Sequence, residues 1–186
     1  VASVALFLAR ERGFSSKECQ ELQISGYMHD LGKLSVPLEI LNKPGPLSQE
    51  ELYVIKKHPF YSFKLIEQIG GMERIKIYGS LHHEGLTGNG YPFHLAEPEI
   101  PLGSRIVACA DIFTALTEDR PYRKGMEEGE VVFLLMDQIK QGTLDKRVVD
   151  ILLDNKEKVF SIRAESQAEA EKEYSSLESR VSFNNL

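Results

Sequence analysis

Residues 102–118 constrain the fold more than any other segment of this sequence. The segment reads LGSRIVACADIFTALTE and is apolar on nearly every side of a helix. A helix that is hydrophobic all round has to be buried, so other elements must cover it from several directions. Asp111, in the middle of its apolar run, is a carboxylate that is costly to bury without a partner. We therefore expect Asp111 to contact a metal ion, several donors or a cation, for which Arg105 is the alternative candidate.

The rest of the chain also predicts helices, with turn signals between them and no alternating strand pattern. Gly13 marks the end of a first helix, and Ser15 with Glu18 and Ser48 with Glu51 have the spacing of capping boxes. The expected helices are 1–12, 16–31, 49–69 with a kink or break at Pro59, 73–83, 102–118, 127–141 and 145–159, with loops at 35–47 and 85–101. These patterns predict an all-α fold, a compact bundle of about six to eight helices with no substantial sheet.

Composition narrows the class of protein. A chain of 186 residues, 42% hydrophobic and 27% charged, is typical of one globular domain with a tail. Neither a membrane-spanning run nor a signal peptide is visible, and Cys19 and Cys109 form no C-x-x-C pair, so we expect a reduced, cytoplasmic setting. The net charge of −6 argues against binding to duplex nucleic acid. It does not exclude a small anionic ligand, because bound metal ions can reverse the charge of a site.

The two ends of the sequence differ in character. Residues 161–186 are rich in Glu, Ser and Ala. We therefore expect a folded domain over 1–158 and a polar helix or flexible tail over 159–186. At the other end, residues 1–8 resemble the middle of an apolar helix face, which predicts that the first helix is truncated.

Four of the five histidines stand beside one another or beside other groups that bind metals. Such nitrogen and oxygen ligands suit divalent iron, manganese, zinc or nickel. Adjacent helical residues point about 100° apart, so each adjacent pair can reach different sides of one cluster. An aspartate can bridge two ions and an imidazole cannot, which favours a dinuclear site bridged by Asp30. The candidate ligands are His29, Asp30, His58, His82, His83 and Asp111.

Each candidate also has a simpler interpretation. A single histidine at a helix end, such as His58, is often a surface or capping group, and we interpret His94 as structural. Lys33 would share a helix face with His29 and Asp30 if the helix continued through Gly32. It could then contact a phosphate oxygen or a leaving group. The alternative is a solvated lysine favoured by the helix dipole.

The run His29-Asp30-Leu31-Gly32-Lys33 resembles the signature of the HD superfamily of metal-dependent phosphohydrolases. Over about residues 1–155 the sequence resembles the HD-GYP subfamily, which are bacterial phosphodiesterases of cyclic di-GMP. The matching segments are HDLGKLSVPLEILNKPGPLS, KKHP, HHEGLTGNGYP, PLGSRIVACADIFTALTEDRPYRKG and GTLDKRVVDILL.

The resemblance implies that the candidate ligands hold two divalent transition-metal ions, iron or manganese, with Asp30 as the bridge. It implies a signalling enzyme that hydrolyses cyclic di-GMP, or a related dinucleotide, by attack of a metal-activated hydroxide on phosphorus. Asp30 and Lys33 would be its catalytic residues. Substrate contacts would come from Lys33, Arg120, Arg123, Tyr91 and Pro92, the arginines because their planar fork suits phosphate. The Gly90-Tyr91-Pro92 loop could also bind partner signalling proteins.

The sequence departs from the family pattern in two places. The family has a further histidine on its first helix, whereas residues 1–28 contain none. We expect that ligand upstream of Val1. After His82-His83-Glu84, residues 85–87 are Gly-Leu-Thr instead of the usual arginine, aromatic and acidic or amide residues. These departures support the alternative of a catalytically weakened sensor or scaffold that binds the ligand or partner proteins. A separate alternative is an HD hydrolase of another nucleotide phosphate ester.

Overall fold

The structure, a computed structural model, describes residues 1–119 and 124–183, with side chains to residue 177. In these ranges its regular secondary structure is helical, with loops between the helices and no strand, only an isolated antiparallel bridge between Thr87 and Ala96. The predicted all-α fold is therefore confirmed. The α-helices are α1 (Ala2–Glu11), α2 (Ser16–Met28), α3 (Leu38–Leu41), α4 (Gln49–Ile55), α5 (His58–Glu67), α6 (Glu73–Ser80), α7 (Leu102–Thr117), α8 (Glu128–Lys140), α9 (Lys146–Asp154) and α10 (Lys156–Phe183), and the 3-10 segments are η1 (Leu31–Ser35) and η2 (Glu97–Glu99).

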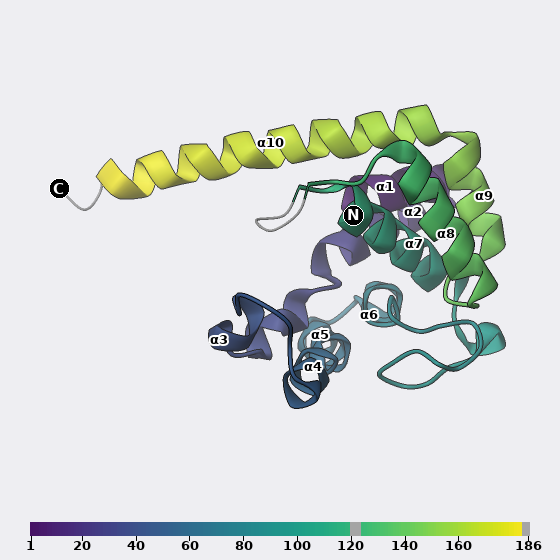
Figure 1. Cartoon of the computed structure of the whole chain (residues 1–186), viewed down its shortest axis with the longest axis horizontal. Helices are drawn as coiled ribbons and strands as arrows, with labels where there is room; N and C mark the ends of the chain where they lie inside the picture. Colours follow the sequence, from purple (N-terminus) through teal and green to yellow (C-terminus); the bar gives the residue numbers. More distant parts are fainter. Residues whose placement is uncertain (120–123, 184–186) are drawn as a thin grey trace.

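Helix α7 lies at the centre of the molecule, as its composition predicts. It packs against α1, α2, α6, α8 and α9, and Figure 1 shows it among them. Val107, Cys109 and Phe113 are fully buried at 0% exposure. Because α7 is covered from several sides, any polar group on it must find its partner inside the protein.

The helix boundaries follow local chemistry. Ser15 and Glu18 form a reciprocal capping box at the start of α2, and Ser48 and Glu51 form another at the start of α4, both as predicted. Gly13 ends the first helical segment with φ 84°, which a residue without Cβ adopts at no steric cost.

The division between α4 and α5 also follows the prediction. Helix α4 ends at Ile55 and α5 begins at His58, with Pro59 in the first turn of α5. At this position proline loses no helical hydrogen bond, because the first backbone N–H groups have no partner within the helix.

Two predictions of secondary structure are wrong. The expected loop at 35–47 contains the single turn α3, and the expected helix at 145–159 is divided at Asn155 between α9 and α10. The Asn155 amide donates to the carbonyl of Ile151, so its side chain satisfies an end of α9 instead of projecting into solvent.

The segment after α2 is the part of the fold that positions the site. Helix α2 ends at Met28, and η1 then turns tightly against α5. A Cβ at Gly32 would lie 2.0 Å from the carbonyl oxygen of His58, so only glycine permits this approach. The backbone on both sides of Gly32 carries His29, Asp30 and Lys33.

Helix α10 starts inside the core and continues beyond the other helices, as Figure 1 shows. Val159 is 0% exposed, whereas residues 171–177 are all exposed. The division into a domain at 1–158 and a polar segment at 159–186 stays a prediction. Among the residues that the structure describes, no helix is long and apolar enough to cross a bilayer.

Candidate metal centre

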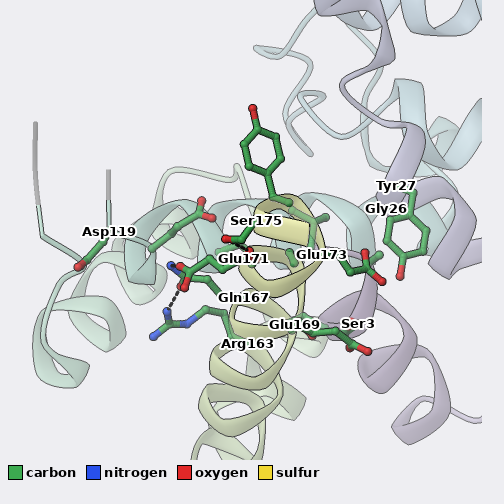
Figure 2. A pocket seen from close by; sticks show the side chains of 18 residues that line it. Ser3, Gly26, Tyr27, Asp119, Arg163, Gln167, Glu169, Glu171, Glu173 and Ser175 are labelled. Carbon is green, nitrogen blue, oxygen red and sulfur yellow. Dashed lines mark hydrogen bonds between the residues drawn. The ribbon is translucent and has the colours of Figure 1, made fainter. Parts of the chain in front are cut away.

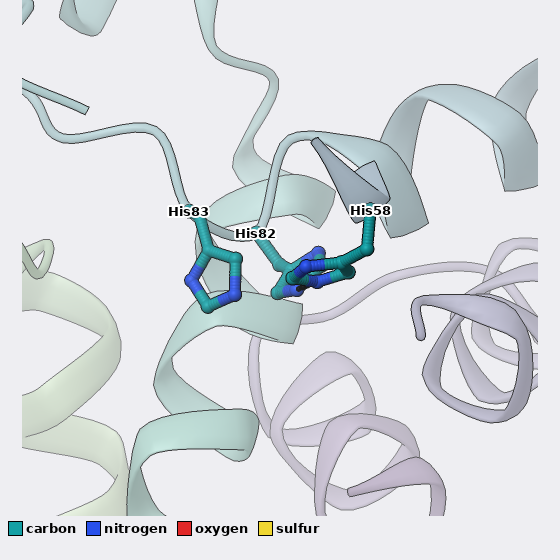
Figure 3. Close-up of side chains that lie close together, drawn as sticks. All are labelled: His58, His82 and His83. Carbon is teal, nitrogen blue, oxygen red and sulfur yellow. Dashed lines mark hydrogen bonds between the residues drawn. The ribbon is translucent and has the colours of Figure 1, made fainter. Parts of the chain in front are cut away.

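The candidate ligands come from four parts of the fold. His29 and Asp30 follow α2, and His58 is the first residue of α5. His82 and His83 follow α6, and Asp111 lies in the middle of α7. Figure 3 shows His58, His82 and His83 gathered side by side. The ring centroids of His82 and His83 are 4.0 Å apart, and those of His58 and His83 are 5.1 Å apart.

The carboxylate of Asp30 lies between the ring of His58 and the ring of His29. Its Oδ1 is 3.1 Å from Nε2 of His58, and its Oδ2 is 3.4 Å from Nε2 of His29. On the far side, Oδ1 of Asp111 is 3.4 Å from the same His29 nitrogen. The two oxygens of Asp30 therefore face different neighbours, which is the arrangement that a bridging carboxylate needs.

Three of the imidazoles are oriented in the same way by the backbone. In each ring Nδ1 contacts the carbonyl oxygen three residues earlier, at 2.9 Å for His29, 2.9 Å for His58 and 2.5 Å for His82. A carbonyl oxygen only accepts hydrogen bonds, so Nδ1 carries the hydrogen. In the neutral ring Nε2 then has a free lone pair, as in histidines that bind metals.

These lone pairs point at other acceptors. Nε2 of His58 and Nε2 of His82 are 3.4 Å apart, which places two electron-rich atoms face to face. Ligand atoms about 2.1 Å from one ion stand about 3.0–3.4 Å apart at tetrahedral or octahedral angles. Two sets of three residues could each share one ion, because the ligand atoms within each set lie within 4.8 Å of one another. The first set is His58, His82 and His83, and the second is His29, His82 and Asp111. The residues therefore fit divalent metal ions.

The protonation of the cluster agrees with this fit. Burial lowers the pKa of His82 well below 6.5 and that of His83 to about 2, so both rings are neutral at pH 7. Burial alone would raise the pKa of Asp30, but the close contact with the His58 ring and the charges of His29 and Lys33 lower it far more. At Asp111 burial also acts to raise the pKa, and the hydrogen bond from His29 lowers it overall. Both carboxylates are therefore ionised.

His29 is the ring that faces both carboxylates. Burial acts to lower its pKa, but the hydrogen bond to Asp111 and the charge of Asp30 raise the pKa overall. Without a metal the site therefore draws a proton to His29. Binding of a metal would release that proton, because a ligand nitrogen must be deprotonated.

Lys33 lies beside the cluster although the helix does not continue through Gly32. Its Nζ is 2.5 Å from Oδ2 of Asp30, and its side chain is 41% exposed. The predicted closeness of Lys33 to Asp30 is therefore confirmed. It arises from the 3-10 turn of η1 and not from a continued α-helix.

Tyr91 of the predicted GYP loop contacts the cluster directly. Its ring stacks on His83 with centroids 4.7 Å apart and an interplanar angle of 26°, and its N–H donates to the His83 carbonyl at 3.1 Å. Pro92 follows through a cis peptide bond, and both side chains are half-buried. Burial, with the charges of Asp111 and Asp30, raises the pKa of the Tyr91 hydroxyl above its usual range.

The alternative prediction, that Arg105 pairs with Asp111, is wrong. Arg105 instead binds Asp145 and Glu97, each at 3.0 Å, because the loop before α7 and the start of α9 lie against its guanidinium. The other predicted substrate contacts, Arg120 and Arg123, lie outside the described residues.

Two buried polar residues near the site were not predicted. Glu84 is 3% exposed and accepts hydrogen bonds from the N–H groups of Phe93 and Leu95 at 2.7 and 3.0 Å. Its position directly after His83 was the available signal. Ser62 is 0% exposed, donates to the His29 carbonyl at 2.7 Å and accepts from the Gly32 N–H at 2.8 Å. No sequence pattern distinguishes it from other helical serines.

A separate open pocket of about 1050 Å³ lies between α1, the end of α7 and α10 (Figure 2). Thr114, one turn after Asp111, is on its wall, but the candidate ligands are not among the residues that line it. The pocket and the ligand cluster are therefore lined by different residues.

Comparison with known proteins agrees with this geometry. The family described as HD domain matches residues 1–148. The chain is 38% identical to a 3'3'-cGAMP-specific phosphodiesterase 1 of Vibrio cholerae over 91% of this chain and 39% of that protein. It is 37% identical to the cyclic di-GMP phosphodiesterase response regulator RpfG of Xanthomonas campestris over 82% of this chain and 41% of that protein.

A solved structure of Bd1817, an HDG"Y"P protein from Bdellovibrio bacteriovorus, shares the fold. The TM-score is 0.64 at 23% identity, over 82% of this chain and 50% of that one. The chain thus spans about two fifths of the length of the two curated relatives described above.

Proposed function

Because the chain belongs to the HD domain family, we propose that it is a metal-dependent phosphodiesterase that hydrolyses cyclic di-GMP or a closely related cyclic dinucleotide. The names of the two phosphodiesterase relatives support this reaction class. The chain covers only part of each of them, so the activity of a whole protein is part of the proposal.

One observation carries the proposal: the lone pairs of oriented imidazoles face one another and two ionised carboxylates in a buried cluster. His58 Nε2 lies 3.1 Å from Asp30 and 3.4 Å from His82 Nε2, so a metal ion bound among these three groups would satisfy all of them as ligands. We propose two ions, iron or manganese, because imidazole and carboxylate ligands suit these metals. The proposed ligands are His29, Asp30, His58, His82, His83 and Asp111.

The ions would activate water as the nucleophile and would neutralise charge on the phosphoryl oxygens. The residues of the chain hold the reacting groups. Lys33, beside Asp30 and partly exposed, would hold a non-bridging phosphate oxygen or stabilise the departing 3′ oxygen. Tyr91 and Pro92 would form one wall of the substrate site next to His83. Arg120 and Arg123 stay proposed phosphate contacts.

A second candidate substrate is 3'3'-cGAMP. The specific support is the 38% identity to a phosphodiesterase named for that dinucleotide, over 91% of this chain. Both substrates offer the same 3′,5′ phosphodiester to the proposed metal centre and differ in one base. The choice between them therefore depends on contacts to the base and not on the ligand cluster.

The proposal is tested by metal content and turnover together. The protein is loaded with Mn²⁺ or Fe²⁺ and incubated with cyclic di-GMP, 3'3'-cGAMP and the linear dinucleotide pGpG. We expect cleavage of at least one cyclic dinucleotide, and we expect Asp30→Ala to lose both metal binding and turnover. Asp150→Ala, which removes an exposed carboxylate paired with Lys146, should retain both.

Three outcomes have separate meanings. A protein that binds two metal ions and cleaves none of the cyclic dinucleotides would refute the substrate class. Binding of a cyclic dinucleotide without turnover would support the sensor or scaffold alternative. Retention of metal by Asp30→Ala would refute the bridging role.

A further inference from the structure

The loop that carries Tyr91 is attached to the site by the buried carboxylate of Glu84. Oε1 of Glu84 accepts from the Phe93 N–H at 2.7 Å, and Oε2 accepts from the Leu95 N–H at 3.0 Å. Both oxygens therefore bind the loop beyond Tyr91. A carboxylate that accepts two amide hydrogens holds its partners more strongly than a neutral acceptor does.

The backbone before Tyr91 is held just as closely. A Cβ at Gly90 would lie 2.3 Å from the nitrogen of Gly85 and 2.5 Å from the carbonyl oxygen of His83, so glycine is needed for the loop to return to this point. Tyr91 then donates its N–H to His83 and stacks its ring on that imidazole. Displacement of the loop would therefore remove Tyr91 from His83.

The base of the loop has its own attachments, which do not involve Glu84. Leu86 donates its N–H to Gly142 at 2.7 Å and accepts from the Glu97 N–H at 2.9 Å. Loss of the Glu84 carboxylate should consequently release residues 91–95 while the base of the loop stays in place. This separation makes a local role distinguishable from a role in overall stability.

We propose that Glu84 is a positioning residue that acts through Tyr91 to fix the imidazole of His83. The inference rests on the proposed function, in which His83 is a metal ligand. The orientation of a ligating imidazole depends on the groups that surround it, and changes in those groups typically reduce metal affinity or activity by about 10–100-fold.

The test is a double-mutant cycle of Glu84→Gln and Tyr91→Ala on the full chain. Glutamine keeps the size of the side chain but turns an NH2 group toward one of the two N–H donors. We expect Glu84→Gln to raise the dissociation constant for Mn²⁺ and to lower kcat/KM, each by about tenfold. In a Tyr91→Ala background the same substitution should change both by less than about twofold, because the path through Tyr91 is already lost.

Glu99→Gln is the matched control on the same loop. Glu99 is exposed and accepts a single N–H, from Ala96 at 3.2 Å, away from His83. We expect wild-type Mn²⁺ affinity and turnover from this variant. If Glu84→Gln destabilises the protein too far to assay, Glu84→Asp enters the same cycle, since it retains the charge with a shorter reach.

Two results would overturn the inference. One is wild-type Mn²⁺ affinity and turnover in Glu84→Gln, and the other is effects of Glu84 and Tyr91 that multiply instead of overlapping. If the wild-type protein cleaves no cyclic dinucleotide, the proposed function fails, and the cycle in Mn²⁺ affinity still decides the role of Glu84.

Discussion

At the scale of single residues, the site depends on backbone carbonyls at the ends of helices. The last carbonyl groups of a helix have no partner within it. The rings of His29 and His82 use such carbonyls, of Gly26 and Gly79, as acceptors for Nδ1. One contact therefore satisfies a helix end and aims a metal-binding nitrogen into the cluster.

Ser62 is the residue that holds the chain in place after α2. Its hydroxyl joins the carbonyl of His29 to the N–H of Gly32 from the neighbouring helix α5. We expect Ser62→Ala to lower the free energy of unfolding by about 1–3 kcal/mol, because two buried backbone groups lose their partner. Urea unfolding measures this change.

Ser175→Ala provides the comparison for Ser62. Ser175 is exposed on α10, and its hydroxyl also donates to a backbone carbonyl, that of Glu171 at 2.8 Å. We expect a change within about 0.5 kcal/mol at this site. Equal effects of the two substitutions would mean that the Ser62 hydroxyl has no special structural role.

At the scale of elements, Asp145 belongs to an ion-pair network that connects α7, α9 and η2. It caps α9 by accepting the Arg147 N–H at 2.8 Å, and it pairs with the guanidinium groups of Arg105 on α7 and Arg147 on α9. Glu97 of η2 contacts the same two arginines. This network attaches the end of the long loop to the helical core.

The network makes part of the stability depend on pH. Burial acts to raise the pKa of Asp145, but hydrogen bonds from Arg147 and Arg105 lower it from 3.8 to about 2. The ionised form is therefore favoured by the folded state, and its contribution is present above pH 3.8 and lost as the pH falls toward 2. We expect Asp145→Asn, which can still cap α9, to cost about 1–2 kcal/mol at pH 7.

Urea unfolding from pH 7 down to pH 3 tests this expectation. The difference in the free energy of unfolding between wild type and Asp145→Asn should decrease once the pH falls below about 4. A difference that stays constant over this range would show that the carboxylate charge contributes nothing to folding.

At the scale of the whole molecule, the two parts of α10 contribute differently to the stability of the fold. Val159 is fully buried, and the ring of Phe160 contacts Phe113 of α7 with centroids 5.1 Å apart. Residues 171–177 are exposed. The start of α10 thus belongs to the folded core, although its later part extends away from the other helices (Figure 1).

Two truncations separate these contributions. A chain that ends at Ala170 should keep its free energy of unfolding within about 0.5 kcal/mol of the full chain. A chain that ends at Asn155 should lose at least about 3 kcal/mol, because the core loses Val159 and Phe160. Thermal unfolding of the three chains measures the difference, and equal stability of the two shorter chains would contradict this division.

Much of the fold was predictable because its signals are local. The capping boxes, Gly13 and the break at Pro59 involve residues within one helical turn, so their effect hardly depends on the rest of the protein. The family and the residue types of the candidate ligands were also evident, since they lie in short motifs. The apolar character of 102–118 was sufficient to place α7 in the core.

Only the tertiary structure decided which distant groups meet. Arg105 pairs with Asp145, 40 positions away, instead of with Asp111 on its own helix, and Ser62 reaches back 33 positions to His29. Glu84 accepts hydrogen bonds from the N–H groups of Phe93 and Leu95, in a loop whose path the sequence does not predict. Contacts within a turn follow from the identity of neighbouring residues, whereas these pairings depend on how whole elements pack, which no short segment encodes.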